Sequence, residues 1–192
     1  MAKKLLLGAI IGGVILFLWG AVSHMLLPFA TAALHPFTNE EAVKQAVIAN
    51  APRSGVYFLP YMMQEGLTEE QQNAVFERAM QGPVLFVAVR QGRAASFGSL
   101  LGIQFLIDVL TGLLLTALLL NARPMGYAKR VLFVVGVALV VTIAGHLPAW
   151  NWYNFSTPFT AGEFFDTLVG FALAGLALAR IVKPQATTAA SI

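Results

Sequence analysis

The sequence contains no cysteine and little charge. The lack of cysteine excludes disulfides, thiolate metal sites and cysteine nucleophiles. Only 11% of the 192 residues are charged and 58% are hydrophobic, whereas an ordinary soluble domain is about 25% charged. So little charge cannot cover the surface of a water-soluble domain of this size. The composition therefore indicates an integral membrane protein.

The common catalytic signatures are also missing. The sequence has no Walker phosphate loop, no GxSxG, no HExxH and no Rossmann fingerprint. No nucleophile and base can be paired from their spacing. An enzyme is therefore the least favoured class, and the sequence identifies no cofactor.

Four apolar runs are long enough to form membrane-spanning helices, because a hydrocarbon core about 30 Å thick needs about 20 apolar residues as helix. The runs cover residues 5–27, 97–120, 131–147 and 161–182. The first exceeds the apolar region of about 7–15 residues found in signal peptides, so we expect it to stay in the membrane. The expected fold class is an all-α integral membrane four-helix bundle, with a small extracytoplasmic α/β cap domain between helices 1 and 2.

The basic residues predict the orientation of this bundle. Segments 1–4, 121–130 and 180–192 contain seven basic residues and no acidic one: Lys3, Lys4, Arg123, Lys129, Arg130, Arg180 and Lys183. Because Lys and Arg in short loops mark the cytoplasmic side, we expect a multi-pass protein of the cell membrane with both termini cytoplasmic. This distribution also accounts for the net charge of +3 without a nucleic-acid partner.

The division of the chain follows from the spans. Transmembrane helix 1 is expected over 1–27, the cap over 28–96, and helices 2 to 4 over 97–183. A short cytoplasmic loop is expected at 121–130 and an aromatic outer loop at 148–160, where Pro148 and Pro158 should stop one helix and delay the next. Residues 184–192 are small and polar and are expected to form a flexible tail.

Two helices and two strands are predicted within the cap. Thr38 with Glu41, and Thr68 with Gln71, have the spacing of capping boxes at helix starts. Each predicted helix is followed by an apolar run of strand type, at 55–61 and 83–90. Four spans with a long, partly strand-forming first outer loop resemble the claudin layout. That resemblance is one of topology, because the W-GLW element and the two cysteines of the claudin first loop are lacking.

Asp108 is the most informative polar residue, because it is the single charge deep within the second span. Gln104 and Thr111 lie four residues before it and three residues after it, so the three share one helix face. A charge at this depth costs several kcal/mol unless it is paired, hydrated or protonated. The three residues are predicted either to bind a proton, a cation or a polar ligand, or to form a hydrogen-bonded contact between helices.

Other residues have weaker functional interpretations. Four residues around the aromatic outer loop could form an interfacial belt or a ligand platform: His146, Trp150, Trp152 and Tyr153. Thr160 and Glu163 fit a third capping box, which would place the acids Glu163 and Asp166 in the first turns of a helix. His24, His35 and His146 are weak candidates for a metal site, but no metal-binding spacing accompanies them and no metal site is predicted.

Small residues within the spans predict close helix packing. Gly8 with Gly12, and Gly170 with Ala174, have small-xxx-small spacing, which favours a tight bundle or an oligomer. The leading hypothesis is a structural or accessory membrane protein, as a homo-oligomer or with other membrane subunits, in contact with membrane lipid. The alternative is a small transport or binding protein for a proton, cation or hydrophobic ligand, using intramembrane Asp108.

Overall fold

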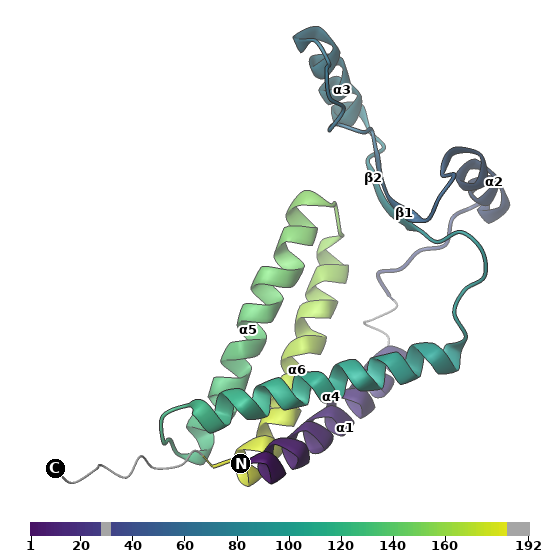
Figure 1. Ribbon diagram of the computed structural model, residues 1–192. Helices are drawn as coiled ribbons and strands as arrows, with labels where there is room; N and C mark the ends of the chain where they lie inside the picture. Colours follow the sequence, from purple (N-terminus) through teal and green to yellow (C-terminus); the bar gives the residue numbers. More distant parts are fainter. Residues whose placement is uncertain (28–31, 184–192) are drawn as a thin grey trace. The chain divides into compact units, whose positions relative to one another are not determined.

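The computed structural model describes residues 1–27 and 32–183, and the expected tail at 184–192 lies outside the described residues (Figure 1). The chain divides into two compact units. The first unit consists of Met1–Leu34, Ser96–Leu147 and Thr157–Ile192. The second unit consists of His35–Ala95 and Pro148–Ser156.

Four long helices make up most of the first unit. They are α1 (Ala2–Met25), α4 (Phe97–Asn121), α5 (Tyr127–Trp152) and α6 (Thr157–Ile181). The last turn of one of them, α5, belongs to the second unit. Each is long and apolar enough to cross a membrane. The sequence prediction of four such helices is confirmed.

The ends of α5 and α6 differ from the expected ones. Pro148 lies inside α5, which continues to Trp152, because a proline removes a single backbone donor and the turns on either side can remain helical. Pro158 is the second residue of α6, where its fixed φ suits the first helical turn. The connection expected at 148–160 is therefore reduced to residues 153–156. The capping box at Thr160 was wrong, since Thr160 is a buried residue within α6.

Glycines allow α1 to pack closely against α4. A Cβ added to Gly112 would lie 2.7 Å from the Ala9 carbonyl oxygen and 2.8 Å from the Gly13 amide nitrogen. A Cβ on Gly12 would lie 3.0 Å from the Cα of Gly112. The small residues of α1 thus meet a partner helix of the same chain, where the two backbones touch.

The same helix also packs against α6, so α1 lies between two neighbours. A Cβ on Gly170 of α6 would lie 2.9 Å from Cδ1 of Trp19. Side chains of α4, α5, α6 and the residue after α6 form a buried apolar core: Leu115, Leu119, Val134, Leu178 and Val182.

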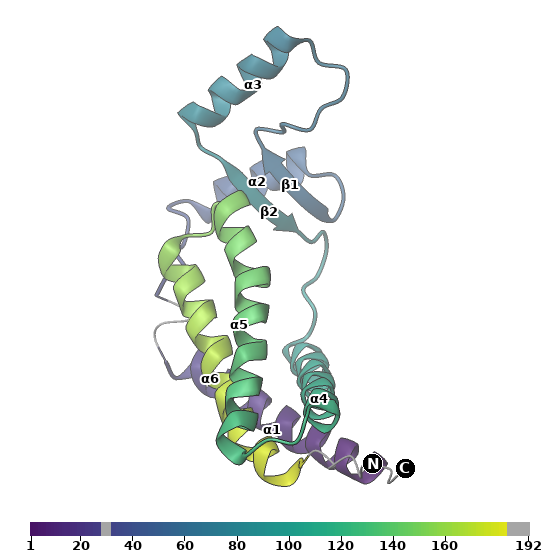
Figure 2. The same ribbon diagram turned by 90° about the vertical axis from the view of Figure 1, so that its left-hand side faces the viewer.

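The helices α5 and α6 lie side by side and are joined at one end by a short connection (Figures 1 and 2). At the other end of the pair, buried Arg130 in the first turn of α5 donates to the last turn of α6. Its Nε and Nη2 lie 2.9 and 2.7 Å from the Ala179 carbonyl oxygen, and its Nη1 lies 2.6 Å from that of Met125. A cation at a helix C-terminus satisfies free carbonyls and suits the helix dipole.

The second unit has the predicted order of helix, strand, helix, strand. Its elements are α2 (Glu40–Asn50), β1 (Gly55–Leu59), α3 (Glu69–Gln81) and β2 (Leu85–Val89). The strands pair antiparallel, with Gly55 opposite Val89 and Leu59 opposite Leu85. The Gln91 side chain donates to the Ala51 carbonyl and so connects the end of α2 to the residues after β2.

One of the two predicted capping boxes in this unit is confirmed. Thr68 and Gln71 form the reciprocal pair at the start of α3. The box at Thr38 was wrong, because Asn39 is the N-cap of α2 and its side chain accepts from the Ala42 amide. Asn binds a free helix amide at least as well as Thr, so the helix starts one residue later. Glu41 instead accepts from Gln45 and Lys44, and these hydrogen bonds lower its pKa.

Candidate functional site

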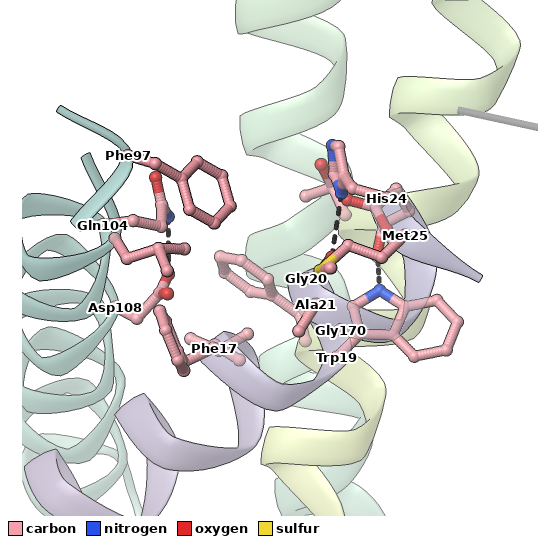
Figure 3. Close-up of a pocket in the computed structure, with 15 residues that line it drawn as sticks. Phe17, Trp19, Gly20, Ala21, His24, Met25, Phe97, Gln104, Asp108 and Gly170 are labelled. Atoms are coloured by element: carbon pink, nitrogen blue, oxygen red, sulfur yellow. Dashed lines mark hydrogen bonds between the residues drawn. The ribbon is translucent and has the colours of Figure 1, made fainter. Parts of the chain in front are cut away.

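A groove of about 450 Å³ lies within the first unit, among α1, α4 and α6 (Figure 3). It is formed by the second half of α1, the first half of α4 and the middle of α6. Its apolar lining includes Leu16, Phe17, Phe97, Leu101 and Phe171. Such a volume, with mainly apolar walls and a few polar groups, is typical of small-molecule sites.

Asp108 and Gln104 form the polar part of the α4 wall. Gln104 Nε2 donates to Asp108 Oδ1 at 3.1 Å, as the spacing of four residues allows. Both residues line the groove, and Asp108 is half-buried. Thr111, predicted to extend this face, is not among the lining residues, and its hydroxyl donates to the Ile107 carbonyl at 3.0 Å. Two of the three predicted residues therefore face the groove.

Asp166 provides the second carboxyl group, from α6. The Trp19 indole donates to the Asp166 backbone carbonyl at 3.0 Å, which fixes this turn of α6 against α1. Within the described part of the chain, Asp166 Oδ1 is buried and accepts no hydrogen bond. A buried carboxyl oxygen without a donor is costly in a medium of low polarity. A bound cation or a proton would remove that cost.

The two acids lie at similar depths along their helices. Counted from the first residue of each helix at about 1.5 Å per residue, Asp108 is roughly 17 Å along α4 and Asp166 roughly 14 Å along α6. Both acids therefore lie well inside their helices and not at the helix ends.

The lining contains two acids and, among the residues that the structure describes, no Lys or Arg. Histidine is represented by His24, whose Nδ1 lies 2.9 Å from Ser23 Oγ and 3.1 Å from the Gly20 carbonyl. Phe17, Trp19 and Phe97 add aromatic faces, which attract cations. The groove thus combines apolar walls with chemistry suited to a positive group.

The three histidines are not brought together as a metal site. His24 lines the groove, His146 Nε2 lies 3.5 Å from Thr167 Oγ1, and His35 belongs to the second unit. Over residues 1–27 and 32–183, no three His, Cys, Asp or Glu side chains converge in a way that could hold a metal ion.

Tyr153, the aromatic residue directly after α5, packs within the second unit. The Tyr153 ring stacks on Phe86 of β2, with centroids 4.2 Å apart and planes 17° apart. Phe86 also meets Phe58 of β1 edge to face at 6.2 Å. Trp150 and Trp152 are 47% and 71% exposed, so both retain a surface for lipid or a partner. Tyr153 therefore completes a small aromatic cluster of this unit.

Sequence reasoning identified Asp108 but did not connect Asp166 with it. Asp166 was predicted in the first turns of a helix, where an acid suits the dipole, but that prediction was wrong because α6 begins at Thr157 and Asp166 is its tenth residue. The available signal was its spacing of four from Gly170, which places both on one face of α6. Gly170 is the residue against which Trp19 packs.

Comparison with protein families, with curated proteins and with solved structures found no match to this chain.

Proposed function

We propose that the chain is a membrane protein that binds a small organic cation with an apolar body in the groove among α1, α4 and α6. The lining of the groove supports this most directly, with two carboxyl groups among aromatic and aliphatic side chains. A cation would neutralise acids that are otherwise expensive in an apolar medium. The apolar body of the ligand would cover the remaining lining.

A steric test uses two glycines with open space around them. A Cβ at Gly20, which lines the groove, or at Gly102, which does not, would meet nothing within 4 Å. Gly20→Leu should fill the groove and abolish binding of octylamine, whereas Gly102→Leu should bind it normally. Trp19 fluorescence in lipid nanodiscs, with Trp150 and Trp152 replaced by Phe, would report binding.

A charge test distinguishes a cation-binding site from a groove that binds any apolar ligand. The double variant Asp108→Asn with Asp166→Asn should weaken octylamine binding by about 10- to 100-fold, corresponding to a lost charged hydrogen bond of about 1.5–3 kcal/mol, whereas either single variant keeps one acid for the ammonium group. Glu163→Gln is the matched control, because Glu163 lies on α6 outside the groove. Equal affinity for octylamine and the neutral octanol in the unmutated protein would refute the proposal.

We further propose that the four helices span the cell membrane with both termini cytoplasmic. The helices are long and apolar enough, and basic residues are concentrated in the segments that would face the cytoplasm. Reporter domains fused after Ile192 and inserted near Gln64 should give cytoplasmic and extracytoplasmic signals respectively. A cytoplasmic signal at Gln64 would reverse the orientation.

One observation favours a role as an accessory subunit or homo-oligomer as a second candidate. The second unit exposes large apolar side chains, including Met63 at 77%, Phe76 at 58% and Met80 at 88%. Exposed apolar surface of this kind is typical of protein contacts. The mass of the particle extracted in mild detergent would distinguish a monomer from an oligomer, and Phe76→Gln with Met80→Gln should dissociate an oligomer that uses this face.

A further inference from the structure

We infer that the groove selects a dication: a linear diamine or polyamine whose two ammonium groups bind Asp108 and Asp166, with the polymethylene chain crossing α1 between them. This inference rests on the proposed function and specifies its ligand class. It follows from how the helices distribute the two acids.

The acids come from helices on either flank of α1. Asp108 belongs to α4 and Asp166 to α6, and α1 packs against both of these helices. Figure 3 shows Asp108 with Gln104 on one side of the groove and Trp19 with His24 on the other, with Phe17 between them. The hydrogen bond from Trp19 to the Asp166 carbonyl assigns that acid to the Trp19 side.

A single ammonium group serves both acids only where the two carboxylates converge to within roughly 6 Å, two contacts of about 2.8 Å each. Asp108 lies on one side of Phe17, and Trp19, to which the Asp166 backbone is hydrogen-bonded, lies on the other (Figure 3). Two cationic groups joined by an apolar chain would meet each acid separately. No basic side chain among the described lining residues competes for either position.

The floor of the groove suits the chain that would join the two charges. Leu16, Phe17 and Gly20 of α1 line it. At Gly20 a side chain would find no atom within 4 Å, so the backbone leaves room for a ligand there. An extended polymethylene chain is narrow and apolar, so it would fit the part of the groove lined by these three residues.

The experiment compares matched ligands that differ in the second charge. Octylamine, 1,8-diaminooctane and 1,8-octanediol are titrated against the protein in nanodiscs, with Trp19 fluorescence as the signal and protein-free nanodiscs as the blank. We expect the diamine to bind at least about tenfold more tightly than octylamine, a difference of about 1.4 kcal/mol. Partitioning into lipid cannot account for this result, because octylamine enters lipid more readily than the diamine and would then give the stronger signal.

Variants of the two acids show whether Asp166 binds the second ammonium group of the diamine. In Asp166→Asn the advantage of the diamine should disappear, while octylamine still binds through Asp108. In Asp108→Asn the diamine should also lose its advantage, while octylamine still binds through Asp166. Equal affinity for diamine and octylamine in the unmutated protein, with both dependent on Asp108, would overturn the inference and leave the proposed function intact. Failure of every amine to bind would overturn both.

Discussion

Arg130 shows how one side chain can join the ends of two helices. Its guanidinium is buried against carbonyl groups and, in the described structure, has no carboxylate partner. Arg130→Met should lower the free energy of unfolding in detergent by about 1.5–3 kcal/mol, because charged hydrogen bonds are lost and Ala179 keeps an unsatisfied carbonyl. Lys129→Met, at the exposed neighbouring position, should change stability little. An equal loss in the two variants would show that charge near the membrane surface, not this contact, is responsible.

Single residues differ in how far the sequence reveals their roles. Asp108 was identified because a charge deep in an apolar run has few explanations. Asp166 and Arg130 already had adequate local explanations, as a dipole-compatible acid and as a residue marking the cytoplasmic side. Their partners, Trp19 and the Ala179 carbonyl, come from other helices. Only the packing of those helices determines such contacts.

At the scale of elements, the contact between α1 and α4 depends on backbone proximity. Gly112→Ala would place a methyl group against backbone atoms of α1 that cannot move independently. We expect it to destabilise the protein by about 1–3 kcal/mol. Gly102→Ala, on the same helix and with nothing within 4 Å, should be neutral or slightly stabilising through helix propensity. Thermal unfolding of the two variants in the same detergent would measure the difference, and equal midpoints would contradict the close crossing.

The existence of the elements was easier to predict than their ends. Long apolar runs and strand-like runs define helices and strands by composition and periodicity, and all eight elements correspond to predicted ones. The ends depend on competition between neighbouring signals. Asn39 displaced Thr38 as a cap, and Pro148 did not end α5 because the surrounding turns remain helical. The glycine pattern of α1 predicted close packing, but not that α4 would be the partner.

At the scale of the whole molecule, the second unit is assembled from two distant parts of the chain. The stacking of Tyr153 on Phe86 is an explicit contact between those parts. A double-mutant cycle with Tyr153→Ala and Phe86→Ala should give a coupling energy of about 0.5–1.5 kcal/mol. Hydrogen exchange at the amides of β2 would report the loss. Trp152→Ala, at a mainly exposed position, provides the control, and purely additive effects of the two substitutions would argue against the stack.

Residues 148–156 are the last part of the second unit to leave the ribosome. Phe86 is synthesised well before Tyr153, and at about 5–20 residues per second the interval is roughly 3–13 s. During that interval the nascent strands β1 and β2 lack their stacking partner, and an isolated pair of strands is marginally stable. Maturation of this unit is therefore coupled to completion of α5. A chain interrupted between α4 and α5 should leave residues 35–95 open to proteases, even though every one of those residues has been made.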